Sequence, residues 1–420
     1  MKSRTWMWMS VMNLFATLAF ALLAIQSAQA QTFSVIYNFT GGSDGAKPYA
    51  GLTIDAAGNL YGTASAGGAG YGTVFKLKHK NSSWLLTPLY IFQGGNDGDG
   101  PEARVIIGPN GSLYGTTSSG GRFGAGSVFN LRAPVAFCKT PLCPWTESVL
   151  YSFTDGLDGG SPLGDLVFDQ EGNFYGTTSA GGYLHDGTVF KVDTLGNETV
   201  LHSFNSTDGA DPRAGLIKDE AGNLYGTTLF GGRNEGCPPV EVYGCGTVFK
   251  VDATGTLTDL YRFSLPPDAI EPSGNLVLDK AGNLYGTTTQ GGSGDCFAYS
   301  RELGKVQVGC GTVFKLDSTG GQETVLYSFL GGSDKNPLAG LVLDAAGNLY
   351  GTTYGVAGGD GGTVFKVDAS GNETVLYRFT GGSDGANPSC TLAFDAKGNL
   401  YGTTQGGGAN GHGVVFEITP

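Results

Sequence analysis

The stretch from Glu323 to Asp368 contains four short apolar segments, E-T-V-L-Y-S-F (323–329), G-L-V-L-D (340–344), N-L-Y-G-T-T (348–353) and G-T-V-F-K-V-D (362–368). Each segment has the length of a β-strand and is rich in Val, Leu, Phe, Tyr or Thr. Asp-Ala-Ala-Gly-Asn joins the second segment to the third, and Asp-Ala-Ser-Gly-Asn leads from the fourth into the next E-T-V-L-Y-R-F. Glycine after a type I turn forms a short hairpin connection, so we predict a four-stranded antiparallel meander.

The same unit recurs along the chain. Tyr-Gly-Thr occurs seven times at intervals of 50 to 65 residues, beginning at Tyr61, Tyr114, Tyr175, Tyr225, Tyr285, Tyr350 and Tyr401. Radial repetition of four-stranded sheets is the plan of a β-propeller. We therefore predict an all-β, seven-bladed propeller in which residues 31–420 form a single domain. A β-solenoid is the rival fold, but its shorter coils and parallel strands fit these hairpin turns poorly.

The two ends of the repeat region complement each other. The chain begins with a lone outer-type strand (33–39) and ends with a third-type strand (413–419). We expect the first strand to complete the last blade and so remove the open sheet edges. We also expect the tyrosine of Tyr-Gly-Thr to pack between neighbouring blades, together with one phenylalanine from each third strand: Phe75, Phe129, Phe190, Phe249, Phe314, Phe365 and Phe416.

The phrase D-x-x-G-N-L-Y-G-T-T, followed by G-T-V-F-K and E-T-V-L-Y-S-F, resembles the GloVer tandem repeat of bacterial exported proteins, the group called choice-of-anchor tandem repeat proteins. The resemblance covers essentially all of residues 31–420, and the phrase recurs with little change at 279–288 and 344–353. It implies an extracytoplasmic repeat protein in a group whose members often end in a surface-sorting segment. This chain departs from that pattern at Ile418-Thr419-Pro420, where neither an apolar anchor nor a basic tail follows.

Residues 1–30 are typical of a cleavable secretory signal, with Lys2 and Arg4, an apolar stretch, and Ala28-Gln29-Ala30 at the end. We expect cleavage near Ala30 and a secreted or periplasmic product without a membrane-inserted segment. The formal charge of -13 disfavours nucleic acid as a partner, because phosphate groups would be repelled. A glycan or a protein is the expected partner of a chain that we expect to be monomeric.

Aspartates recur in the links between blades, each three or four residues before a proline. Seven carboxylates around a pore would suit Ca²⁺, which prefers oxygen ligands. The alternative is that each aspartate bonds nearby backbone N–H groups in an Asp-Gly turn, and presence in every repeat favours this structural role. The seven residues are Asp44, Asp97, Asp158, Asp208, Asp268, Asp334 and Asp384.

The loops after Tyr-Gly-Thr vary in length, and they share one face with the links between blades. Two of them are expanded, at 231–246 and 291–311. Their aromatic, acidic and arginine side chains suit sugar stacking and hydroxyl hydrogen bonds, but also a protein partner or no ligand at all. The candidate ligand-binding residues are Arg233, Glu235, Tyr243, Phe297, Tyr299, Arg301 and Glu302.

Six of the seven cysteines form close pairs inside insertions, which in an oxidising compartment predicts three disulfides. The pairs are Cys138 with Cys143, Cys237 with Cys245, and Cys296 with Cys310. The seventh, Cys390, is expected to be a buried thiol. His185 and His412 lie in variable loops without the pattern of a metal site or a catalytic triad.

These features favour an exported, non-catalytic binding module that uses the variable loops of one propeller face. A carbohydrate-active enzyme, either a lyase or a glycosidase, is the first alternative, since Glu235, Asp295 and Glu302 supply carboxyl groups. The second alternative is a structural protein of the cell envelope. No catalytic residue is assigned from the sequence.

Overall fold

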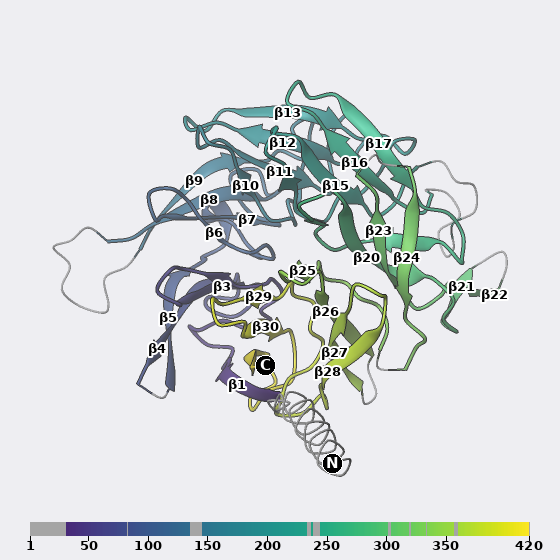
Figure 1. Ribbon diagram of the computed structural model, residues 1–420. Helices are drawn as coiled ribbons and strands as arrows, with labels where there is room; N and C mark the ends of the chain where they lie inside the picture. The colour runs from purple at the N-terminus through teal and green to yellow at the C-terminus, as the bar shows by residue number, and fades with distance from the viewer. Residues whose placement is uncertain are drawn as a thin grey trace, which may run out of the picture.

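The computed structural model describes residues 31–81, 83–134, 145–232, 237, 244–300, 304–318, 321–332, 334–356 and 360–419. Sheets of these residues surround a common axis (Figure 1). In the described residues η1 (Gly95–Asp97) is the one helical turn, and none of their helices has the length and apolarity to cross a bilayer. The predicted signal segment, residues 1–30, lies outside the described residues.

Each blade is an antiparallel meander whose strands follow one another from the axis outward. The first four blades comprise β2 (Thr53–Ile54), β3 (Leu60–Ala64), β4 (Thr73–Lys80) and β5 (Ser83–Ile91); β6 (Ile106–Ile107), β7 (Leu113–Thr117), β8 (Ser127–Arg132) and β9 (Thr146–Ser152); β10 (Val167–Phe168), β11 (Phe174–Thr178), β12 (Thr188–Val192) and β13 (Glu198–Ser203); and β14 (Ile217–Lys218), β15 (Leu224–Thr228), β16 (Thr247–Val251) and β17 (Leu257–Arg262).

The last three blades follow the same order. They comprise β18 (Ala269–Pro272) and β19 (Val277–Leu278), which both pair with β20 (Leu284–Gly291), then β23 (Thr312–Leu316) and β24 (Glu323–Ser328); β25 (Val342–Leu343), β26 (Leu349–Val356), β27 (Asp360–Val367) and β28 (Glu373–Arg378); and β29 (Ala393–Phe394), β30 (Leu400–Thr404), β31 (Val414–Thr419) and β1 (Thr32–Asn38). A separate hairpin of β21 (Phe297–Ser300) and β22 (Gly304–Gln307) projects from blade 5. The predicted seven-bladed propeller is confirmed, and its antiparallel pairing excludes the solenoid.

The ring is closed by the first strand of the repeat region. β1 pairs antiparallel with β31, with Phe33 opposite Ile418 and Asn38 opposite Val414. Blade 7 therefore combines three strands from the end of the chain with one strand from residues 32–38, as the sequence predicted. Every blade consequently has a neighbour on both sides.

A pair of phenylalanine rings joins each blade to the next. The residue that follows an outermost strand, such as Phe263 in blade 4, meets the third-strand phenylalanine of the next blade, here Phe314, at a ring-centroid distance of 5.2 Å and in an edge-to-face arrangement. All seven junctions contain this pair at 5.0–5.3 Å. The rings are fully buried, so the third-strand phenylalanines pack between blades as predicted.

The glycine of Tyr-Gly-Thr makes room for this ring. In blade 5, Gly286 lies directly opposite Phe314 in the sheet, and a Cβ atom on Gly286 would lie 2.6 Å from Cζ of Phe314. The corresponding distance is 2.4–2.7 Å in all seven blades. A side chain at this glycine would displace the phenylalanine from the junction.

We predict that Gly286→Ala destabilises the propeller by about 1–3 kcal/mol, because overpacking forces buried neighbours to shift. Urea unfolding followed by tryptophan fluorescence measures the change. Gly321→Ala in the same blade is the matched control, since a Cβ atom there has open space, and it is expected to change stability by less than about 0.5 kcal/mol. Equal stability of the two variants would contradict this packing account.

Four junctions also contain a carboxyl group at the start of the outer strand. One oxygen, Oε1, of each of these glutamates is buried and has no hydrogen-bond partner in the described part of the chain. The groups are Glu147, Glu198, Glu323 and Glu373, and each faces an aspartate of the preceding link, namely Asp97, Asp158, Asp268 and Asp334. The other three blades have Leu86, Leu257 and Phe33 in the same register. Burial first, and repulsion by the facing aspartate second, raise the pKa of each glutamate to about 7.

We predict that the propeller loses thermal stability between pH 5 and pH 8. A raised carboxyl pKa in the folded state contributes stability that is complete below the unfolded pKa, near 4.5, and is lost as the pH rises through about 7. The melting temperature should therefore fall across this range. A Glu198→Leu, Glu323→Leu double variant copies the residues of other blades and should show a flatter profile. An unchanged slope in the double variant would refute the assignment.

Candidate functional site

The variable loops and the blade-to-blade links lie on the same face of the ring, because they connect strands at the same end of each blade. Short backbone bridges join link to loop within a blade, for example Gly160 with Ala180 and Ala386 with Gly406. The Asp-x-x-Gly-Asn turns connect the opposite ends of the strands. A ligand site that differs from blade to blade is therefore expected on the loop face.

A cavity of about 420 Å³ opens on the axis at this face. Each link ends in a proline that is followed at once by a side chain lining the cavity. These residues, one from each blade in order, are Tyr49, Glu102, Leu163, Arg213, Ser273, Leu338 and Ser389. The wall thus combines an aromatic ring, a carboxyl group, a guanidinium group, two leucines and two hydroxyl groups.

A polar network closes the floor of the cavity. Arg104 of blade 2 approaches Asp165 of blade 3 through its backbone N–H at 2.8 Å and its guanidinium group at 3.1 Å. Asn275 of blade 5 donates to the same carboxylate at 2.8 Å and accepts a hydrogen bond from Gly215 N–H of blade 4 at 2.7 Å. Four blades are therefore tied together next to the axis.

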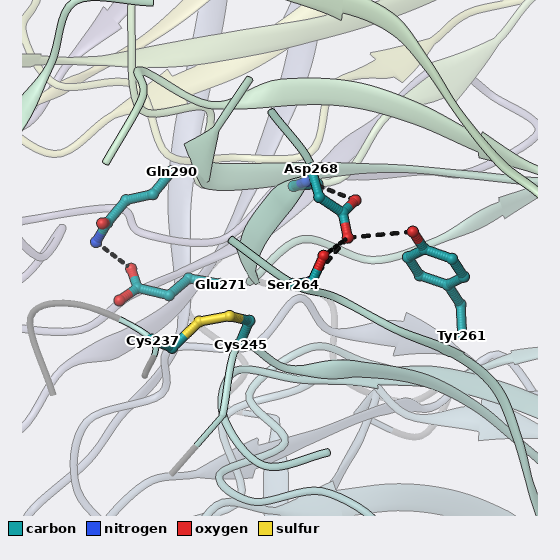
Figure 2. The surroundings of a disulfide bond; sticks show 8 residues. Cys237, Cys245, Tyr261, Ser264, Asp268, Glu271 and Gln290 are labelled. Carbon is teal, nitrogen blue, oxygen red and sulfur yellow. Dashed lines mark hydrogen bonds between the residues drawn. A yellow bond between two sulfur atoms is a disulfide. The ribbon is translucent and has the colours of Figure 1, made fainter. Parts of the chain in front are cut away.

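Charged groups in the wall are fixed by neighbouring side chains. Asp211 holds Arg213 through three hydrogen bonds of 2.7–3.0 Å, while half of the Arg213 side chain stays exposed. Glu271 accepts a hydrogen bond from Thr289 at 2.9 Å. It also accepts one from Gln290 at 2.7 Å (Figure 2). Glu102 of blade 2 also lines the cavity and is close enough to Arg213 for an electrostatic interaction.

The ionisable groups of the wall have shifted pKa values. Burial raises the pKa of the Glu102 carboxyl and of the Glu271 carboxyl, and nearby Arg213 opposes the shift in both. Burial, together with the charge of Glu102, also raises the pKa of the Tyr49 hydroxyl. Raised carboxyl pKa values inside a cavity are a common property of binding and catalytic sites.

A second cavity of about 350 Å³ adjoins the first beneath the β21–β22 hairpin. Gln290 and Asn336 line both cavities, so the two are neighbours. Phe297 contributes its partly exposed ring, over which the Lys305 ammonium group lies 3.9 Å from the centroid. The disulfide between Cys296 and Cys310 closes the base of this insertion.

The predicted loop residues have different positions. Phe297 lines the second cavity, whereas Tyr299 is 80% exposed and lines neither cavity. Arg233, Glu235, Tyr243, Arg301 and Glu302 lie outside the described residues, as do Cys138 and Cys143. The disulfides Cys237–Cys245 and Cys296–Cys310 are present, and Cys390 is a buried thiol as predicted.

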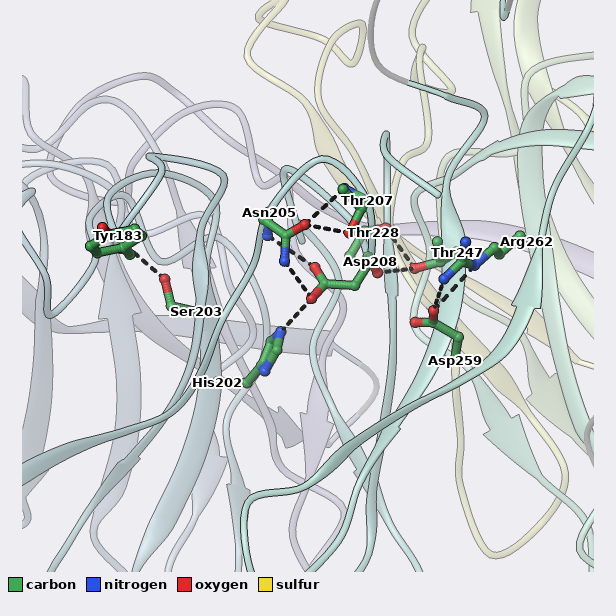
Figure 3. Close-up of polar contacts among 10 residues, drawn as sticks. All are labelled: Tyr183, His202, Ser203, Asn205, Thr207, Asp208, Thr228, Thr247, Asp259 and Arg262. Carbon is green, nitrogen blue, oxygen red and sulfur yellow. Dashed lines mark hydrogen bonds and ion pairs between the residues drawn. The ribbon is translucent and has the colours of Figure 1, made fainter. Parts of the chain in front are cut away.

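None of the seven link aspartates lines either cavity. Asp208 accepts hydrogen bonds from His202 on the outermost strand and from the backbone and side chain of Asn205 (Figure 3). Asp44, Asp97, Asp158, Asp268 and Asp384 make the equivalent bonds to a tyrosine hydroxyl and a backbone N–H, and Asp334 accepts from Thr363. Among the described residues, no group of three or more His, Cys, Asp or Glu side chains is arranged to hold a metal ion.

We predict that EDTA leaves the melting temperature of the propeller unchanged, because neighbouring protein donors already bond these carboxylates. Differential scanning calorimetry with and without added Ca²⁺ measures the effect. A rise in melting temperature with Ca²⁺ would instead restore the metal interpretation.

The cavity residues were missed by the sequence analysis, although the sequence contains a signal for them. Each link has the pattern X-Pro-Z followed by a small residue in most blades, as in Lys47-Pro48-Tyr49-Ala50 and Glu271-Pro272-Ser273-Gly274. The proline repeats while X and Z change from blade to blade. Variation beside an invariant residue, inside a repeat that is otherwise nearly constant, marks side chains that the scaffold does not require.

Comparisons with known proteins agree with the repeat and the fold. A family model described as the Gloeobacter/Verrucomicrobia repeat matches residues 22–238 and 297–420. No curated protein matches the chain in sequence.

Several solved structures are similar to this chain at low sequence identity. The extracellular domain of a putative one-component system of B. thetaiotaomicron matches with a TM-score of 0.51 and 11% identity, over 92% of this chain and 40% of that one. PorZ, a surface component of the type-IX secretion system of Porphyromonas gingivalis, matches with a TM-score of 0.50 and 14% identity, over 89% and 46%. A gluconolactonase of Xanthomonas campestris matches with a TM-score of 0.44 and 18% identity, over 82% and 94%. At these identities the similarity concerns the fold alone.

Proposed function

The chain belongs to the Gloeobacter/Verrucomicrobia repeat family, and we propose that it is an exported, non-catalytic binding module whose axial cavity holds a hydroxyl-rich ligand, namely a glycan. The observation that carries this proposal is the ring of cavity-lining side chains after the seven prolines. A position used only by the scaffold would repeat, as the phenylalanine pairs do. This position has five residue types in seven blades.

The chemistry of the wall supports a glycan in particular. Tyr49 offers an aromatic face of the kind that stacks on a sugar ring, and Glu102, Arg213 and Ser389 offer acceptors and donors for hydroxyl groups. A cavity of about 420 Å³ lies within the usual size range of small-molecule sites, roughly 300–1,000 Å³. Phe297 in the adjoining cavity extends the site toward the rim for a longer chain.

Export is supported by the two disulfides, since such bonds persist in oxidising compartments. It is also supported by the signal-like sequence of residues 1–30.

We predict that residues 31–420 bind glycans on a printed array of neutral, acidic and amino sugars, and that Arg213→Ala weakens binding about tenfold, as expected when a charge-assisted hydrogen bond is lost. Phe297→Ala should weaken only the longer glycans. Tyr299→Ala on the same hairpin is its matched control, because Tyr299 lines neither cavity. Absence of wild-type binding to every glycan would refute the proposal.

An enzyme that acts on a glycan is the second candidate. The observation in its favour is the raised pKa of Glu102 and Glu271, because a protonated carboxyl group is suited to general acid catalysis. Mass spectrometry of array hits incubated with the wild type and with Glu102→Gln distinguishes the two functions. Product formed only by the wild type would replace the binding module with an enzyme.

A further inference from the structure

The residue before each link proline has the left-handed backbone conformation in every blade. Its φ angle is between 51° and 64° in all seven. The residues are Lys47, Gly100, Ser161, Asp211, Glu271, Asn336 and Asn387. Glycine adopts this conformation freely, whereas other L-residues are strained in it and only Asn and Asp tolerate it comparatively well.

The backbone alone explains why this conformation repeats. The N–H group of each of these residues donates to a carbonyl oxygen of the preceding blade at 2.8–3.2 Å, for example Glu271 to Cys245 and Lys47 to His412. In six blades the carbonyl oxygen of this residue accepts a hydrogen bond from a backbone N–H group at the end of the second strand of the same blade. In blade 1, for example, Ser65 N–H donates to the Lys47 carbonyl oxygen. The following proline packs on a glycine of the preceding blade, where a Cβ atom would lie 2.5–2.8 Å from Cδ of the proline.

None of these contacts uses the side chain. Glycine would therefore serve the scaffold best, and Gly100 in blade 2 demonstrates that the junction accepts it. The other six blades nevertheless have polar side chains at this position. Three of these residues, Lys47, Ser161 and Glu271, are neither Asn nor Asp, the two types that tolerate the left-handed conformation comparatively well. Backbone strain that the junction contacts do not require is typical of functional positions.

Three of these residues contribute to the wall of the axial cavity. Glu271 and Asn336 line it directly, and Asp211 fixes the guanidinium group of Arg213, which lines it. Lys47, Ser161 and Asn387 do not line it themselves. Each has the same backbone conformation as Glu271 and comes two residues before a lining side chain, namely Tyr49, Leu163 and Ser389. The position thus forms a second ring of variable residues, two residues before the ring formed by Tyr49 and its counterparts.

We infer that the six non-glycine residues before the link prolines determine which glycan the axial cavity selects, an inference that rests on the proposed glycan-binding function. The two rings together place a different pair of side chains at each blade, such as Asp211 with Arg213 and Glu271 with Ser273. Hydroxyl and amino groups of a sugar would be distinguished by these pairs, because an unpaired buried polar group disfavours the wrong ligand.

Replacement by glycine separates a role in recognition from a role in the scaffold. Glu271→Gly and Lys47→Gly remove the side chain and relieve the strained backbone. In Glu271→Gly this relief offsets the loss of the hydrogen bonds from Thr289 and Gln290, so the melting temperature should be unchanged or raised in both variants. On the same printed glycan array, each variant should lose about tenfold in affinity or change the set of glycans bound. Asn81→Gly is the matched control, since Asn81 has a φ of 57° in the β4–β5 hairpin on the opposite face, and it should bind as the wild type does.

The outcomes are distinct. A fall in the melting temperature of Glu271→Gly would assign its side chain to the scaffold and overturn the inference. Unchanged glycan profiles in both variants, with binding still lost in Arg213→Ala, would overturn the inference while leaving the proposed function in place. A wild type that binds no glycan would overturn both.

Discussion

The fit between one glycine and one phenylalanine at each blade junction determines the geometry of the ring. The second strand lacks a side chain opposite the third-strand phenylalanine, so the ring of that phenylalanine lies over the strand and meets the phenylalanine of the preceding blade. Edge-to-face pairs of this kind add roughly 0.5–1.5 kcal/mol beyond burial. Seven equal pairs impose equal spacing, and equal spacing permits the closure by β1.

This repetition also explains which parts of the structure were predictable. Strand order, hairpin turns, ring closure and the buried aromatic positions all follow from local chemistry that the chain repeats seven times. The axial cavity depends instead on closure, which brings together residues that are remote in sequence. Asp165 and Asn275 are 110 positions apart, and nothing near either of them in sequence indicates that they touch.

The link aspartates were easy to find in the sequence, because they recur in every blade. Their recurrence alone did not indicate the direction in which the side chains point. In the structure the outer-strand tyrosine or histidine and the loop backbone take up the carboxylate oxygens, as for Asp44 and Asp208. A residue that is present in every blade, such as the link aspartate, has a structural role that every blade requires. The residues that differ between blades, before and after the proline, are those at the cavity.

The seven blades share one backbone arrangement, but the side chains at the axial cavity differ from blade to blade. Charged side chains of the two rings come from blades 1, 2, 4 and 5, at Lys47, Glu102, Asp211 with Arg213, and Glu271, whereas blades 6 and 7 supply only asparagine, leucine and serine. The network at the floor is also confined to part of the ring, since Arg104, Asp165 and Asn275 belong to blades 2, 3 and 5. The backbone bonds and the proline–glycine contact of each link do not use the side chains before and after the proline, so these two side chains are free to differ between blades. A symmetrical ring thereby presents a one-sided polar wall, which suits a ligand that has no symmetry of its own.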